Sequence, residues 1–221
     1  MIQRDMTKRF QSSLKSMTNI YLFDEIDSLG DDFVQNNMPA LPRFRREECE
    51  RYQQDFDKKA CAAAFLLLKY GLRERFGITQ EVTFDYSEHG KPYLREFPDV
   101  YFNLSHCKKA VVCALSDLEV GVDVQDIRSL NMNTALRTCS ESEIEQLEKS
   151  EYSERLFCKF WTQKESYSKA KSVQLTSVFK RDLSSEEFYT FEHSDYFLTV
   201  YQTETADISL IKLTKGDMGN Y

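Results

Sequence analysis

Glycine, proline and long apolar runs are all scarce in this chain of 221 residues, which holds 7 Gly and 4 Pro. With apolar residues at 41% and charged residues at 29%, the composition argues for a globular protein with a sizeable core and against disorder. The longest apolar run, residues 61–68, is far too short for a membrane span, and the N-terminal residues are too charged for a signal peptide. We therefore expect a soluble, cytoplasmic protein with no membrane partner.

Metal-binding cysteine motifs are also missing, although six cysteines are present. They form no CxxC pair and no zinc-type spacing, so we predict reduced thiols, with zinc or disulfide bonding as the alternative. The formal net charge of −7 is unfavourable for general nucleic-acid binding, so any polyanion would need a local basic patch. The cysteines are Cys49, Cys61, Cys107, Cys113, Cys139 and Cys158.

The pattern of predicted elements repeats once along the chain. Each half has a strand, one or more helices and then three short strands, and a polar junction at residues 116–119 separates the halves. The predicted strands are residues 19–23, 82–86, 100–104, 110–115, 120–124, 188–192, 196–202 and 208–213. The predicted helices are residues 43–57, 58–76 and 155–171, with one more opening at a capping box from Ser140 to Glu143.

This order predicts an α+β fold of two similar subdomains, each a small antiparallel sheet with helices on one face. We place the subdomains at residues 1–117 and 118–221, with a ligand cleft between them. The last three strands alternate like neighbours in one antiparallel sheet, and residues 215–221 look like a tail.

A carboxylate on a predicted strand is the first candidate for chemistry. Asp123 and Gln125 are two residues apart in Gly-Val-Asp-Val-Gln, so their side chains point to one face while Val122 and Val124 point to the other. Taken alone, the pattern also fits an ordinary half-buried strand with its polar side in water.

A helix offers a second carboxylate and a cation. Glu165 and Lys169, in Trp-Thr-Gln-Lys-Glu-Ser-Tyr-Ser-Lys at residues 161–169, are four positions apart and therefore share one helical face. A solvated surface ion pair would have the same spacing. Together with Asp123, they provide two hard oxygen ligands and one positive charge, which suits a magnesium-bound pyrophosphate.

Three further segments hold groups that can bind anions. Ser105 and His106 directly follow the predicted strand at residues 100–104, in Asn-Leu-Ser-His, where they could donate to a phosphate or simply belong to a surface turn. A Gly-Lys-Pro turn contains Lys91 and could hold a ring or a phosphate, or be a plain hairpin turn. The basic stretch at residues 43–59 is interleaved with acids, so a solvated helix face explains most of it.

Taken in order, these motifs resemble those of the surfactin-type 4′-phosphopantetheinyl transferases. The resemblance is clear from residue 90 to residue 169 and extends by element order over the whole chain. It implies a pseudo-dimer of two α/β subdomains, with coenzyme A and Mg²⁺ in the cleft. It also implies a holo-[acyl-carrier-protein] synthase activity, which moves the phosphopantetheine arm of coenzyme A to a serine of an apo acyl or peptidyl carrier protein and releases adenosine 3′,5′-bisphosphate.

The resemblance assigns the catalytic roles to Asp123, Glu165 and Lys169. Asp123 and Glu165 match the metal ligands, Glu165 also serves as or positions the base, and Lys169 matches the cation beside the pyrophosphate. Gln125 stands where many family members carry a further acid, and its amide oxygen is expected to reach the metal directly or through water. Asp126 points away by strand alternation.

The resemblance also implies contacts with coenzyme A. Arg51 is our choice for the arginine on the 3′-phosphate, with Arg45 and Arg46 as rivals. The expected contacts are Lys91, Ser105, His106, Lys169, Arg51 and Arg45. A non-catalytic module that binds coenzyme A or a carrier protein is the alternative function, and a structural protein is a third. We expect a monomer, because the two halves of one chain already build the cleft.

Overall fold

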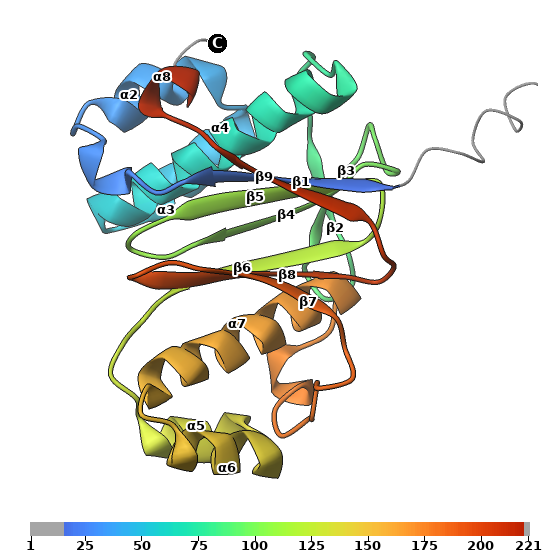
Figure 1. The fold of residues 1–221 in the computed structure, drawn as a ribbon. Helices are drawn as coiled ribbons and strands as arrows, with labels where there is room; N and C mark the ends of the chain where they lie inside the picture. Colours follow the sequence, from blue (N-terminus) through green and yellow to red (C-terminus); the bar gives the residue numbers. More distant parts are fainter. Residues whose placement is uncertain (1–15, 219–221) are drawn as a thin grey trace, which may run out of the picture.

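The computed structural model describes residues 16–218, and its layers can be followed from top to bottom in Figure 1. Helices cover one face of a first β-sheet, a second sheet lies against its other face, and further helices cover the outside of the second sheet. The fold is α+β with two subdomains of sheet and helices, which confirms the predicted class. No helix within residues 16–218 is both long and apolar enough to cross a membrane.

The first sheet has the strand order β4-β5-β1-β9, the second has β6-β8-β7, and β2 and β3 form a separate pair. The strands are β1 (Met17–Phe23), β2 (Phe84–Tyr86), β3 (Pro92–Leu94), β4 (Tyr101–His106), β5 (Val111–Ser116), β6 (Val120–Asp126), β7 (Phe188–Glu192), β8 (Tyr196–Gln202) and β9 (Asp207–Lys212). The α-helices are α2 (Phe33–Asn37), α3 (Arg43–Arg51), α4 (Asp55–Phe76), α5 (Met132–Thr138), α6 (Glu141–Lys149), α7 (Ser153–Lys171) and α8 (Lys215–Met218). Short 3₁₀ turns are η1 (Ile26–Ser28), η2 (Met38–Ala40) and η3 (Leu175–Ser177).

Alternate residues of β1 show how one strand serves two cores. Tyr21 and Phe23 pack with the helices above the first sheet, whereas Ile20 and Leu22 pack between the two sheets. A strand buried on both faces must be apolar at every position, which β1 and β5 nearly are. The long helix α4 is apolar on nearly all faces for the same reason, because it lies under α2, α3 and α8.

The end of the chain corrects two predictions. Residues 207–212 do not join β7 and β8 but pair in parallel with β1 of the first sheet. The alternation of side chains that predicts a strand carries no information on its partner or direction. Residues 215–218 form α8 rather than a tail, and Met218 is buried in the upper core. The subdomain boundary between residues 117 and 118 stays a prediction. Strand β9 comes after this boundary in the sequence but pairs with β1, which comes before it.

Two helix predictions also differ from the structure. The segment predicted as one helix at residues 43–57 breaks after Arg51, and α4 begins at Asp55. Helix α5 was not predicted at all. The capping box at the start of α6 is confirmed, because Ser140 and Glu143 bond reciprocally to each other's backbone nitrogens.

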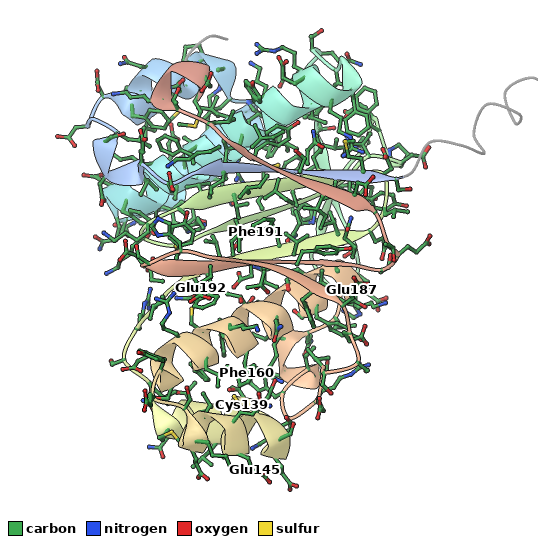
Figure 2. The ribbon with its side chains drawn as sticks, viewed as in Figure 1. Cys139, Glu145, Phe160, Glu187, Phe191 and Glu192 are labelled. Atoms are coloured by element: carbon green, nitrogen blue, oxygen red, sulfur yellow. The ribbon has the colours of Figure 1, made fainter. Side chains whose placement is uncertain are left out.

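Helices α5 and α6 form the lowest layer, under α7. Cys139 and Phe160 lie between these helices in Figure 2, and they pack with Ala135 and Leu147 in a small core of their own. All six cysteines are buried free thiols. Helix α7 is therefore held on both sides, by the second sheet above and by this small core below.

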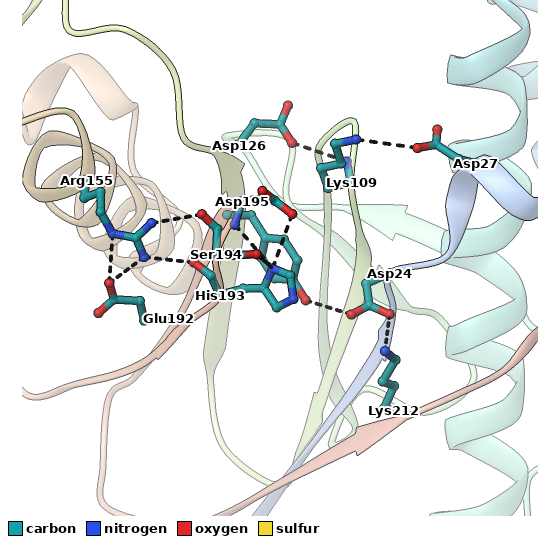
Figure 3. Close-up of polar contacts among 11 residues, drawn as sticks. Asp24, Asp27, Lys109, Asp126, Arg155, Glu192, His193, Ser194, Asp195 and Lys212 are labelled. Carbon is teal, nitrogen blue, oxygen red and sulfur yellow. Dashed lines mark hydrogen bonds and ion pairs between the residues drawn. The ribbon is translucent and has the colours of Figure 1, made fainter.

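A polar seam joins the two sheets at one edge, shown in Figure 3. Asp24 follows β1, accepts a hydrogen bond from the hydroxyl of Tyr196 on β8 at 3.1 Å, and pairs with Lys212 of β9 at 2.8 Å. Lys109, in the turn between β4 and β5, lies 3.6 Å from Asp27. These contacts fix the relative position of the strands that carry the candidate site.

Candidate active site between the two subdomains

Gly121 allows α7 to lie directly on β6. A Cβ atom built on this residue would be 2.0 Å from the backbone oxygen of Ser166 and 2.5 Å from the backbone nitrogen of Ala170, which is closer than any side chain allows. The helix and strand backbones therefore touch. This close approach sets Lys169 of α7 against Asp123, two residues further along β6.

Asp123 and Lys169 form the centre of the site. Lys169 Nζ lies 2.6 Å from Asp123 Oδ1, and it also lies 3.3 Å from both the backbone oxygen of Val122 and the hydroxyl of Ser105. Ser105 Oγ donates to the same carboxylate oxygen at 2.8 Å. Asp123 is only 5% exposed, so the pair interacts in surroundings that screen charge less than water does.

Glu165 brings the second carboxylate to the same ammonium group. Its Oε2 lies 3.7 Å from Lys169 Nζ. Burial raises the pKa of Glu165, the positive charge of Lys169 opposes this shift, and the negative charge of Asp123 adds to it. The structure thus brings together Asp123, Glu165 and Lys169, the three residues to which the family resemblance assigns catalysis.

One oxygen of this cluster is left without a partner. Asp123 Oδ2 is buried and accepts no hydrogen bond from any atom of residues 16–218. Groups of three or more His, Cys, Asp or Glu suited to a metal are absent from the same part of the chain. Magnesium uses only one or two protein carboxylates when phosphates and waters complete its shell, so Asp123 and Glu165 fit this ion.

Gln125 and Asp126 leave β6 on opposite faces. Gln125 is half-buried and lines an open pocket of about 350 Å³ together with Asp126 and Trp161. Asp126 instead accepts hydrogen bonds from the backbone nitrogens of Lys108 and Lys109, each at 3.2 Å. Figure 3 shows the contact of Asp126 with Lys109, in the turn between β4 and β5. The carboxylate of Asp126 is therefore bound to the turn between β4 and β5. Its direction away from Asp123 and Glu165 stays a prediction from strand alternation.

His106 is exposed at the end of β4. The surrounding protein removes part of its hydration and lowers its pKa; Asp57 opposes this shift, whereas Lys169 and Arg45 add to it. The imidazole is therefore neutral in the free protein at neutral pH. A neutral ring beside two cations can take up a proton when a phosphate binds.

Lys91 lines a pocket of about 260 Å³ that both subdomains form. Its Nζ donates to the backbone oxygen of Ala170 at 3.1 Å, and burial lowers its pKa, with Glu119 opposing the shift. The preceding Gly90 has φ of 80°, a conformation that glycine adopts readily. Lys169 lines the same pocket, so two lysines from different subdomains face one space.

The three candidate arginines of α3 differ in their surroundings. Arg45 is 8% exposed, lies 2.6 Å from Glu48, and contributes to the lowered pKa of His106. Its Nε is buried with no hydrogen-bond partner among residues 16–218. Arg46 donates to the backbone oxygen of Leu41 at 2.7 Å, and Arg51 is exposed at the last residue of the helix. The assignment of Arg51 to the 3′-phosphate stays a prediction.

Sequence reasoning did not give roles to Gly121 and Asn103. A glycine inside a strand signals a close backbone approach, so Gly121 could have been found. Asn103 lies on β4 with its Oδ1 accepting a hydrogen bond from the backbone nitrogen of Val122 at 2.8 Å. That contact depends on how two strands meet, and the sequence gives no signal for it.

Two family models match this chain one after the other. The model of the 4′-phosphopantetheinyl transferase superfamily matches residues 119–217, and the model of the N-terminal part of 4′-phosphopantetheinyl transferases matches residues 31–117. The chain belongs to the 4′-phosphopantetheinyl transferase superfamily.

Individual relatives carry the same name. The 4′-phosphopantetheinyl transferase Sfp of Bacillus subtilis strain 168 is 24% identical over 185 residues, covering 82% of this chain and 80% of the relative. The 4′-phosphopantetheinyl transferase psf-1 of Bacillus pumilus is 30% identical over 152 residues, covering 66% and 65%. A further 4′-phosphopantetheinyl transferase of Bacillus subtilis is 27% identical over 135 residues, and the chain spans 60% of its length.

Proposed function

We propose that this protein transfers the 4′-phosphopantetheine group of coenzyme A to a serine of an apo carrier protein, of the acyl or peptidyl kind. The arrangement of Asp123, Glu165 and Lys169 carries the proposal: two carboxylates beside one ammonium group, with one buried carboxylate oxygen unpartnered among residues 16–218. The adjacent pocket with Lys91 and Lys169 supports a ligand with several negative charges. Membership in the superfamily supports the reaction type.

The transfer forms a bond between the serine oxygen and the phosphorus next to pantetheine, and it breaks the bond from that phosphorus to the bridging oxygen. Adenosine 3′,5′-bisphosphate leaves with the bridging oxygen. A serine hydroxyl is a weak nucleophile, so a base that accepts its proton speeds the attack. Glu165 suits this role because its raised pKa makes it a stronger base than an exposed carboxylate. Lys169 stabilises the negative charge that gathers on the leaving oxygen.

Asp123 and Glu165 would hold Mg²⁺, with the amide oxygen of Gln125 as a further donor, directly or through water. The ion would supply positive charge against the pyrophosphate. Lys169 and Ser105 occupy Oδ1 of Asp123, which leaves Oδ2 as the free donor. The protein's own contribution is thus to fix the direction of that oxygen.

The remaining candidates would contact the nucleotide. Lys91 from the Gly-Lys-Pro turn, Ser105 and His106 offer donors to its phosphates. Arg45 is supported for the 3′-phosphate by its buried Nε, which has no hydrogen-bond partner among residues 16–218, and by its charge, which helps to lower the pKa of His106. Arg51 is supported by the family resemblance alone. We expect action in the cytoplasm as a monomer, because one chain forms the whole site.

One experiment tests the proposal. The purified protein is incubated with coenzyme A, Mg²⁺ and an apo carrier protein, and the carrier is weighed by mass spectrometry. A gain equal to one phosphopantetheine group is the expected result. Coenzyme A binding without this gain would select the alternative, a non-catalytic binding module.

A further inference from the structure

Asn103 is a buried polar residue in the middle of β4, at the place where the two sheets meet. It is 6% exposed, and it lines the pocket of about 260 Å³ that also holds Lys91 and Lys169. The pocket's lining contains two lysines and no carboxylate. It is therefore suited to an anionic ligand, and each polar group that faces it is a candidate contact.

Strand β4 is an edge strand of the first sheet and β6 is an edge strand of the second. Within residues 16–218 no ladder of backbone hydrogen bonds joins these two strands, and side chains make the connection instead. Asn103 Oδ1 accepts from the backbone nitrogen of Val122 at 2.8 Å, and Ser105 Oγ accepts from that of Val124 at 3.3 Å. These two acceptors replace the carbonyl groups that a neighbouring strand would offer. At Ser105 a hydroxyl group is enough to accept the backbone hydrogen bond from Val124, so an amide is not required for this type of contact.

The bond to Val122 fixes the direction of the Asn103 amide. Only the oxygen of an amide can accept, so Oδ1 must face β6 and the NH₂ group must face elsewhere. No atom of residues 16–218 accepts a hydrogen bond from Asn103 Nδ2, and the nitrogen is not among the fully buried unpartnered atoms. Two donors on a nine-tenths buried side chain are thus held ready beside the lysine-lined pocket.

We infer that Asn103 is a coenzyme A-binding residue: its Nδ2 donates to a phosphate oxygen in the pocket that Lys91 and Lys169 line. This inference rests on the proposed function. The two ends of the amide have different roles. The oxygen accepts the hydrogen bond from Val122 that joins the two subdomains, and the nitrogen donates to the ligand. An anionic ligand therefore binds beside the hydrogen bonds from Val122 and Val124 that already connect β6 to β4.

The substitution Asn103→Asp separates the two roles. Aspartate has nearly the same shape and keeps an oxygen for Val122, but it replaces the NH₂ donors with a negatively charged oxygen. We expect coenzyme A to bind at least about tenfold more weakly, since a hydrogen bond to a charged group is lost and repulsion is added. The thermal unfolding midpoint should stay close to that of the unchanged protein.

Asn131→Asp is the matched control. Asn131 Oδ1 likewise accepts backbone hydrogen bonds, from Asn133 and Thr134 at the start of α5, and it does not line the pocket. The charge change and the type of contact are the same at both positions. Coenzyme A affinity should remain unchanged in this variant, so a loss in both variants would point to net charge and overturn the inference.

Affinity is measured by calorimetric titration of coenzyme A into each folded protein, with no carrier protein present. If the unchanged protein binds coenzyme A and Asn103→Asp binds it equally well, the inference is wrong while the proposed function stands. If the unchanged protein does not bind coenzyme A, the proposed function itself fails. Should Asn103→Asp prove unstable, Asn103→Ser keeps a hydroxyl acceptor without the amide donors, and unaltered affinity in that variant would equally overturn the inference.

Discussion

Lys169 Nζ lies 2.6 Å from Asp123 Oδ1 and 3.7 Å from Glu165 Oε2, so one ammonium group joins two carboxylates from a strand and a helix. The contact spans 46 positions of sequence. It exists because Gly121 lets the helix backbone rest on the strand. The negative charges that would otherwise repel each other are held in place by the lysine, before any ligand binds.

Replacing either carboxylate should abolish transfer while the protein stays folded. Asp123→Ala and Glu165→Ala each remove a candidate metal ligand, and Glu165→Ala also removes the base. We expect a loss of at least about a hundredfold in turnover. The mass gain of an apo carrier protein measures the rate, and circular dichroism checks the fold. Asp195→Ala, at an exposed carboxylate near the seam, serves as the control. Full activity in either site variant would remove the metal assignment.

The sequence predicted the site better than the path of the chain. Alternation on β6 gave the direction of Asp123 and Asp126, and the four-residue spacing on α7 gave the pairing of Glu165 with Lys169. Their meeting could be inferred only from the family resemblance, since nothing in either local pattern encodes a contact between distant elements.

The missed features have the same physical origin. Strand alternation cannot tell that β9 runs parallel to β1, and local helix signals did not reveal the break between Arg51 and Asp55. The roles of Asn103 and Gly121 likewise follow from packing between segments that are far apart in sequence.

Gln125→Glu should lower the magnesium concentration required for half-maximal transfer. An added carboxylate on the same strand face as Asp123 increases the negative charge around the ion and strengthens its binding. A magnesium titration of the transfer rate at saturating coenzyme A measures the effect. A requirement that is unchanged or higher would show that residue 125 does not face the metal.

Coenzyme A binding should be accompanied by proton uptake at His106. The pKa of this histidine lies below its ordinary value in the free protein, so the ring is neutral at neutral pH. A bound phosphate favours the charged form and raises the pKa, so binding takes up a proton and affinity increases as pH falls through the range between the two pKa values. Calorimetry in two buffers of different ionisation enthalpy measures the uptake.

His106→Gln should remove most of this uptake. His193→Gln is the control, because that ring lies at the polar seam, stacked on Tyr196 and 3.9 Å from Asp195. Equal proton uptake in the unchanged protein and in His106→Gln would show that the ring does not meet the phosphate.

The buried ion pair between Lys164 and Glu143 should be needed for stability. Lys164 Nζ lies 2.9 Å from Glu143 Oε2, the two side chains are 1% and 9% exposed, and Lys164 also donates to the backbone oxygen of Arg181 at 2.8 Å. Lys164→Met leaves the buried carboxylate of Glu143 without its cation in the packed space between α6 and α7, although it keeps the hydrogen bond from the backbone nitrogen of Ser140. We expect the free energy of unfolding to fall by about 3–5 kcal/mol, measured by urea denaturation.

The exposed pair of Lys149 with Glu145 on α6 gives the comparison. Its atoms are 3.6 Å apart and its side chains are 77% and 69% exposed, so Lys149→Met should change the free energy of unfolding by less than about 1 kcal/mol. Adding Glu143→Gln to Lys164→Met removes the unpaired charge and should restore part of the loss. Lys164 is next to Glu165 on α7. A large loss of stability in Lys164→Met would therefore mean that one turn of α7 carries both the proposed base, Glu165, and the ion pair that anchors the helix to α6.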